Sequence, residues 1–187
     1  STVDIDIQKH THDDDHHDDH HEHHEQGFIE KYIFSTDHKM IAKQFLVTGL
    51  LWAFIGGSLS LIFRLQLGFP EESLAWLEPI LGKWIEINPE GVGKLSQEFY
   101  YSLVTMHGTI LVFFVLTAGL SGTFANFLIP LQIGARDMAS PLLNMLSYWF
   151  FFLASVIMMS SLFVQTGPAS GGWTVYPPLS ALGEAST

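Results

Sequence analysis

One histidine lies deep inside a long stretch of sequence that contains no Asp, Glu, Lys or Arg. The stretch runs from 99 to 135, and His107 lies about eight residues into its apolar part, or roughly 12 Å along a helix. An ionisable side chain at that depth is costly, which suggests a function or a fixed partner. Neutral imidazole is a common ligand of haem iron, and Gly108 with Phe113 and Phe114 would suit a flat ring. The alternative is a histidine that hydrogen-bonds a neighbouring helix within an ordinary aromatic core.

An arginine ends the first apolar run. Arg64 follows the uncharged residues 45–63. Its guanidinium either extends to a membrane interface, as long basic side chains commonly do, or hydrogen-bonds the polar edge of a cofactor. Small residues in the same run would let a neighbouring helix approach closely; they are Gly56, Gly57, Ser58 and Ser60.

Four polar residues gather around the opposite end of the predicted helices. Asn126 lies about 19 residues after His107, or roughly 28 Å further along the same helix. Asp137 follows in a short turn, and Asn144 and Ser147 lie in the first two turns of the next apolar run. Two amides, a hydroxyl and a carboxylate around one mouth could hold a file of water for protons. The alternative is that they are helix caps and interface polar groups.

The apolar runs that carry these residues predict an all-α membrane protein. Charged residues make up 14% of the chain, against about 25% in ordinary soluble domains. The uncharged stretches 99–135 and 138–183 are each longer than the roughly 20 residues that a membrane helix needs. We expect three transmembrane helices, at about 45–64, 100–128 and 142–164. The chain has no cysteine, which excludes disulfides and thiolate metal sites, and no basic patch that would bind nucleic acid.

The N-terminal residues 1–25 differ from the rest of the chain. They hold nine acidic residues and one lysine among many histidines, a composition that predicts a disordered tail. Metal buffering by this tail is the alternative hypothesis. We expect no signal peptide, because no basic region precedes a cleavable apolar segment. Lysines 31, 39 and 43 precede the first span and the loop 65–98 is acidic, which predicts a cytoplasmic N-terminus.

Five stretches of the sequence resemble subunit I of the haem–copper oxygen reductases, and within them the cytochrome c oxidases. They are FSTDHKMIAKQFL (34–46), LIFRLQLG (61–68), FYYSLVTMHGTILVFF (99–114), FANFLIPLQIGARDMASPLLNMLSYWFF (124–151) and TGPASGGWTVYPPLS (166–180). The resemblance covers about 34–180. That subunit has about twelve spans, so the resemblance implies that residues 26–187 are the start of a roughly twelve-helix bundle.

The resemblance implies that residues at the outer end bind a low-spin haem, haem A. His107, in the motif MHGTI, matches an axial ligand of the iron. Arg64 matches the arginine that hydrogen-bonds the haem formyl group, and Tyr100 matches a tyrosine near the same haem. Gly172 and Trp173 match the glycine–tryptophan pair beside the haem propionates.

The resemblance also assigns the polar residues of the inner end to a proton channel. Asp137 matches the carboxylate at the cytoplasmic entrance of the channel. Asn126, Asn144 and Ser147 match polar residues that line it. Many members carry a tyrosine where Phe45 stands, so one channel hydroxyl is missing from this chain.

Taken as a whole, the resemblance implies a respiratory terminal oxidase in an energy-conserving membrane, a bacterial plasma membrane. The reaction passes four electrons from cytochrome c to O2, makes water and moves protons outward. The complete subunit would also hold a high-spin haem and copper, and a partner subunit II would carry the copper centre that receives the electrons. The spans present here would not be catalytically complete by themselves.

Three alternatives remain open from the sequence. Ubiquinol oxidases of the same superfamily carry polar residues at a quinol site, where this chain has Ile55, Leu59, Phe99 and Ser102, and GWTVYPPL resembles the cytochrome c branch. The second alternative is a non-catalytic membrane scaffold. The third is a metal-handling membrane protein that acts through its tail. In addition, Gln66 stands where a glutamate helps to bind an outer calcium or sodium ion, so that ion site is not expected.

Overall fold

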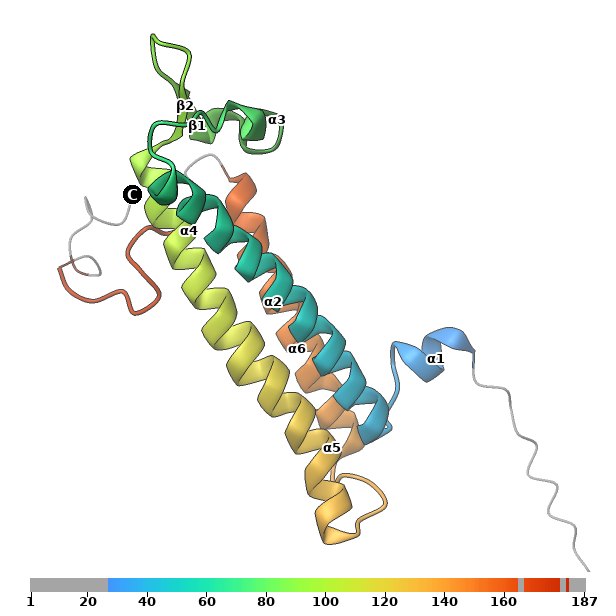
Figure 1. The fold of residues 1–187 in the computed structure, drawn as a ribbon. Helices are drawn as coiled ribbons and strands as arrows, with labels where there is room; N and C mark the ends of the chain where they lie inside the picture. Colours follow the sequence, from blue (N-terminus) through green and yellow to red (C-terminus); the bar gives the residue numbers. More distant parts are fainter. Residues whose placement is uncertain (1–26, 165–166, 179–180, 182–187) are drawn as a thin grey trace, which may run out of the picture.

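The computed structural model describes residues 27–164, 167–178 and 181, and its framework is a bundle of long helices (Figure 1). Three helical stretches are long and apolar enough to cross a membrane: His38–Gly68, Gln97–Ile133 and Pro141–Phe163. The predicted all-α membrane class and its three spans are therefore confirmed. The predicted tail, residues 1–25, lies outside the described residues.

The first long helix, α2 (His38–Gly68), begins well before its apolar run. A short helix, α1 (Phe28–Tyr32), precedes it. The Asp37 side chain caps α2 by accepting a hydrogen bond from the backbone N–H of Lys39, at 3.3 Å. The first two turns or so of α2 therefore lie outside the predicted span and carry Lys39 and Lys43. The buried face of α2 repeats every three to four residues, at His38, Ile41, Phe45, Thr48 and Trp52.

The second stretch is one continuous helix made of three segments: α4 (Gln97–Thr109), the π-helical segment η3 (Ile110–Leu120) and α5 (Ser121–Ile133). The Ser96 hydroxyl caps its start by accepting from the Phe99 N–H. In η3, the Thr117 hydroxyl donates to the Val112 carbonyl five residues back, at 2.8 Å, which matches the wider π turn. Gly134, with φ +70°, ends the helix in the left-handed conformation.

Glycines set the contact between α2 and the second stretch. A Cβ built on Gly49 would lie 3.1 Å from the Gly119 Cα, so the two backbones touch there. A Cβ on Gly56 would lie 3.0 Å from side-chain carbons of Ile110 and Leu111, which confirms the predicted close approach at Gly56. Among the described residues nothing lies within 4 Å of a Cβ built on Gly57, so no helix in this part of the chain approaches it.

The third long helix, α6 (Pro141–Ser160), continues into the 3-10 turn η4 (Ser161–Phe163). Aromatic rings join it to α2: Phe45 lies edge-on to Tyr148 at 5.3 Å between centroids and stacks on Phe151 at 5.4 Å. The resulting core runs along the bundle and includes Ile41, Leu103, Met106 and Ile110, all fully buried.

The connection between α2 and α4 contains more regular structure than the predicted loop. It folds as η1 (Ala75–Leu77), α3 (Glu78–Leu81), η2 (Gly82–Trp84) and an antiparallel hairpin of β1 (Ile85–Ile87) and β2 (Gly93–Leu95). Leu74, Leu77 and Ile85 form a small core beneath it. The Gln66 amide oxygen accepts from the Leu95 N–H at 3.1 Å and so ties the hairpin to the end of α2.

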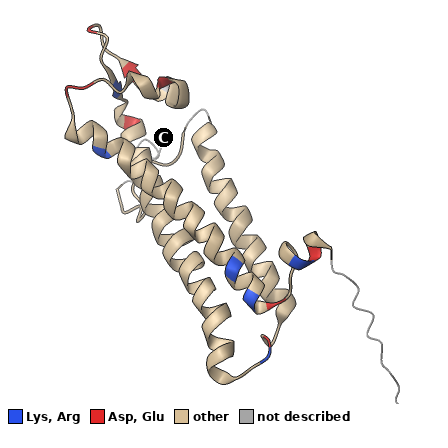
Figure 2. Cartoon of the chain, turned by 45° about the vertical axis from the view of Figure 1, so that its right-hand side comes forward, with Lys and Arg blue, Asp and Glu red and all other residues tan. Residues whose placement is uncertain are grey.

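Charged residues occupy the two ends of the bundle, and the helices between them are almost free of charge (Figure 2). Many large apolar side chains on this middle part are exposed, among them Phe54, Leu116 and Phe150. An apolar surface of this extent fits a membrane setting.

Candidate functional site

His107 is held by a hydrogen bond between two helices. Its Nδ1 lies 2.8 Å from the backbone carbonyl oxygen of Gly56, across the α2–α4 contact. Because a carbonyl only accepts, Nδ1 carries the proton, and the lone pair of the neutral ring resides on Nε2. Nε2 has no hydrogen-bond partner among the described residues. This is the arrangement of a histidine ligand whose second nitrogen is fixed by a backbone carbonyl.

The helix-bonding alternative and the ligand alternative for His107 are therefore compatible, since each uses a different ring nitrogen. The Phe63 ring lies edge-on to the imidazole at 5.7 Å between centroids, and the Tyr100 ring lies edge-on to Phe63 at 5.9 Å. These contacts position His107 and Tyr100 around one ring of Phe63. In the part of the chain that the structure describes, no three His, Asp or Glu side chains cluster closely enough to hold a metal ion.

The segment 167–178 packs against the same part of α4. Gly172 donates its N–H to the Thr105 hydroxyl at 2.9 Å, and the Ser102 hydroxyl donates to the Pro168 carbonyl at 3.0 Å. The Trp173 indole then lies against Gly108, where a built Cβ would be 2.9 Å from the indole Cδ1. The structure thus brings Gly172 and Trp173 to the helix turn that carries His107.

Arg64 is placed differently. It is exposed near the C-terminal end of α2 and makes no hydrogen bond or ion pair with any residue that the structure describes. Its chain neighbour Phe63 lies against His107, but no hydrogen bond or ion pair joins the guanidinium to His107 or Tyr100.

The four inner polar residues do not form a hydrogen-bonded set with one another. Asn126 is buried; its Nδ2 donates to the Gly122 carbonyl at 2.7 Å, and its Oδ1 has no partner among the described residues. The buried Nδ2 of Asn144 also lacks one within that part of the chain. Ser147 is exposed and donates to the Asn144 carbonyl, and Asp137 is exposed and accepts from the Met138 N–H at 2.7 Å.

The two unpartnered amide groups favour the water-file hypothesis over simple caps. Buried polar atoms in native proteins nearly always have a partner, and ordered water is the usual one when protein supplies none. Asn126 and Asn144 therefore each have one amide atom that can hydrogen-bond a water molecule. Ser147 fits the other alternative, because it bonds only its own helix.

Sequence reasoning missed two buried polar features. His38 is 1% exposed, and its Nδ1 lies 2.8 Å from the Asn126 carbonyl oxygen. Thr48 and Tyr148 join their hydroxyls at 2.9 Å between α2 and α6. The available signal was the helical spacing, because His38 and Thr48 lie on the face of α2 that also carries Ile41 and Phe45.

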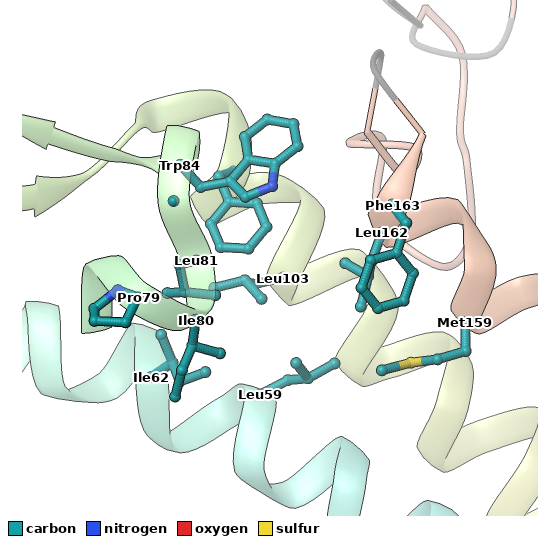
Figure 3. Close-up of a pocket in the computed structure, with 12 residues that line it drawn as sticks. Leu59, Ile62, Pro79, Ile80, Leu81, Trp84, Leu103, Met159, Leu162 and Phe163 are labelled. Atoms are coloured by element: carbon teal, nitrogen blue, oxygen red, sulfur yellow. The ribbon is translucent and has the colours of Figure 1, made fainter.

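An apolar cavity of about 440 Å³ lies between the α2–α4 connection and the ends of the long helices that are nearest to it (Figure 3). Leu59 and Ile62 of α2, Leu103 of α4, and Met159 and Phe163 at the end of α6 project into it, and α3 covers one side. It is separate from the His107 cluster, and none of the predicted site residues lines it.

Comparison with known proteins defines the class of the chain. The family described as "Cytochrome C and Quinol oxidase polypeptide I" matches residues 40–187, and this chain belongs to it. The resemblance found in the sequence is thereby confirmed, and the chain is a membrane-embedded member of the haem–copper oxidase subunit I family.

Similar proteins come from bacteria and archaea. The "Alternative cytochrome c oxidase subunit 1" of Bradyrhizobium diazoefficiens is 41% identical over 81% of this chain and 22% of the relative. The "Cytochrome c oxidase subunit 1" of Synechocystis is 40% identical over 81% of this chain and 23% of the relative. The "Heme-copper oxidase subunit I+III" of Aeropyrum pernix is 37% identical over 82% of this chain and 16% of the relative. The chain therefore spans about a fifth of the length of the relatives it matches.

Proposed function

We propose that this chain is the N-terminal part of the catalytic subunit of a cytochrome c oxidase, with His107 as an axial ligand of its low-spin haem, haem A. The observation that carries the proposal is the hydrogen bond between His107 Nδ1 and the Gly56 carbonyl, which leaves Nε2 unpartnered. Bound there, the haem supplies one-electron transfer between the donor and the O2-reducing centre.

The residues around His107 act by holding its ring. The Gly56 carbonyl fixes the tautomer, and the Phe63 edge limits rotation of the imidazole. Thr105 holds Gly172 by a hydrogen bond, and Gly108 leaves room for the Trp173 ring. The indole therefore lies against the residue that directly follows His107. Arg64, which has no ion-pair partner in the described residues, is proposed to hydrogen-bond the haem formyl group, and Tyr100 to line the same pocket.

The inner residues are proposed to take up protons. The exposed carboxylate of Asp137 receives them from the cytoplasm, and water bound to Asn126 and Asn144 leads them inward, with Ser147 at the margin. The unpartnered amide atoms of the two asparagines support this assignment. Protons then arrive from the face opposite to that of the electrons, which is the geometry that outward proton pumping uses.

The positions of the quinol site favour cytochrome c as the electron donor. Leu59 and Phe99 line the apolar cavity, and the Ser102 hydroxyl is already committed to the Pro168 carbonyl. These side chains offer no free polar group for a quinol ring. We therefore propose, as partners, a copper-bearing subunit II, cytochrome c and O2, and as location a bacterial plasma membrane.

The test is a reduced-minus-oxidised visible spectrum of the intact complex, with extraction of its haems. We expect a low-spin a-type band that is lost in His107→Ala, because no other described residue offers an equivalent nitrogen at that place. A b-type band would point to the quinol branch instead. The absence of haem from the parent complex would overturn the proposal and favour a non-catalytic scaffold.

A further inference from the structure

A buried pair of hydroxyls joins α2 to α6. Thr48 is 7% exposed and Tyr148 is 8% exposed, and their oxygens lie 2.9 Å apart. The other threonines of the long helices use their hydroxyls differently: Thr105, Thr109, Thr117 and Thr123 each donate to a carbonyl of their own helix. Thr48 instead bonds across to another helix.

The pair has an unused proton. Two hydroxyls carry two O–H donors, and their mutual hydrogen bond uses one of them. Neither oxygen has a second partner among the described residues. One donor and further lone pairs are thus available for a water molecule on either side.

The pair lies directly beyond Phe45, as seen from the inner end. The Phe45 ring stands between Gly122, where a built Cβ would be 2.7 Å from the ring, and Tyr148, whose ring lies edge-on at 5.3 Å. The Gly122 carbonyl accepts the Asn126 amide, and Asn144 lies one helical turn before Tyr148 on α6. A hydrocarbon ring cannot pass a proton, so a proton path along this face needs another polar group. The next one past Phe45 is the hydroxyl pair.

A groove large enough for water lies beside the pair. Thr48 and Tyr148 form part of an open groove of about 240 Å³ that Lys43 and Gln44 also line. Several waters fit in such a volume, since each occupies about 30 Å³ in the liquid. The Gln44 Oε1 atom is buried without a hydrogen-bond partner in the described part of the chain, which gives water an anchor there.

We propose that Tyr148 and Thr48 form a relay step of the inner proton path, and that the Tyr148 hydroxyl serves where Phe45 lacks one. The proposal rests on the proposed function. In each passage the pair accepts one proton from water on the inner side and releases one on the outer side. Both side chains remain neutral, and only the direction of their hydrogen bond reverses.

The experiment measures proton uptake and turnover of the full-length complex in lipid vesicles. Tyr148→Phe removes the hydroxyl and keeps the ring, so we expect both rates to fall roughly fivefold while the haem spectrum stays unchanged. Thr48→Val, which keeps the side-chain shape, should act in the same direction. Tyr32→Phe is the matched control, because Tyr32 lies just before α2 and its hydroxyl makes no hydrogen bond with the described residues.

Moving the hydroxyl separates a relay from a structural role. The double change Phe45→Tyr with Tyr148→Phe moves the hydroxyl to the ring that packs edge-on against residue 148, and we expect it to restore proton uptake. Unchanged rates in Tyr148→Phe and Thr48→Val, or a loss that Phe45→Tyr does not restore, would overturn the relay. After such a negative result, Asp137→Asn in the same preparation distinguishes two cases. If it slows proton uptake, only the relay proposal has failed. If it has no effect, the proposed channel itself has failed.

Discussion

The surroundings of His107 fix which ring nitrogen carries the proton and which carries the lone pair. The Gly56 carbonyl takes the Nδ1 proton, and the helix turn beside the ring is filled by Trp173. A ligand that is held in this way loses little freedom when it binds a metal. The precision of the site therefore depends on residues that do not themselves bind anything.

Gly108 is one such residue. A Cβ there would lie 2.9 Å from the Trp173 Cδ1, so we expect Gly108→Ala to displace the indole and shift the low-spin haem band without removing it. Gly57→Ala is the control, since a Cβ on Gly57 meets nothing within 4 Å. The check is the visible spectrum of both variants. An unshifted band in Gly108→Ala would mean that the indole does not influence the haem.

We predict that Asp137 affects proton uptake but not the haem site. Its carboxylate is exposed at the inner turn and touches only the backbone of Met138 among described residues. We expect Asp137→Asn to slow turnover and proton uptake by about tenfold or more, because general acid–base groups commonly contribute at least that much. The haem spectrum should not change. Undiminished turnover in intact membranes would contradict the assignment.

At the residue scale, the structure brings Gly172 and Trp173 beside the helix turn of His107, whereas the side chains of the four polar residues at the other end do not hydrogen-bond one another. His107 could be singled out because one ionisable group in a long uncharged run is conspicuous, and its link to Trp173 came from the resemblance. The tertiary partners of Asn126 could not be predicted, because they depend on how α2 turns against α5. His38 and the Thr48–Tyr148 pair escaped notice for the same reason: each is one polar residue on an otherwise apolar helix face.

The α2 helix and the second long stretch are held together by backbone contact. At Gly49 and Gly119 the two helices approach so closely that a Cβ on Gly49 would lie 3.1 Å from a backbone carbon. A backbone atom within a helix cannot move aside as the end of a side chain can. In a bilayer, where helix association depends on close packing, such a contact is a main source of stability.

We expect Gly49→Ala to destabilise the assembled subunit by about 1–3 kcal/mol, the usual cost of overpacking. Gly57→Ala is again the control, because it adds the same methyl group to the same helix in open space. The measurement is the thermal midpoint of haem loss from the purified complex. Equal midpoints for the two variants would show that the Gly49–Gly119 contact contributes nothing.

Elements with a long repeating pattern were predictable, and short ones were not. The three spans follow from uncharged runs that are about as long as a membrane helix or longer. The hairpin of β1 and β2 was taken for loop, because strands of three residues are too short to show an alternating pattern. The π-helical segment η3 also has no sequence signal, since it differs from an α-helix only in its hydrogen-bonding step.

Across the whole molecule, the two candidate sites lie at opposite ends of one continuous helix. His107 and Asn126 are separated by about 19 residues, or roughly 28 Å along the axis. A haem near one face and a proton entrance near the other would let electrons and protons approach from opposite sides of the membrane. Each charge moved across 100 mV stores about 2.3 kcal/mol, so this separation is what makes the proposed reaction energy-conserving.

That separation requires a defined orientation of the chain. The start of α2, which carries Lys39 and Lys43, lies beside α5 and the turn that follows it, because His38 bonds the Asn126 carbonyl. The acidic connection with the β1–β2 hairpin lies at the other end of the bundle (Figure 1). The positive-inside rule predicts that the lysine end faces the cytoplasm. The hairpin, and with it the His107 side of the bundle, would then face outward.

Single cysteines can test this orientation, because the chain contains none of its own. Glu90→Cys lies at the exposed hairpin end and Ala139→Cys in the exposed turn between α5 and α6. In intact cells we expect a membrane-impermeant thiol reagent to label Glu90→Cys and to label Ala139→Cys only after the cells are opened. The parent subunit without either change corrects for cysteines elsewhere in the complex. Labelling of Ala139→Cys in intact cells would reverse the orientation and place Asp137 outside, where it could not collect protons for outward pumping.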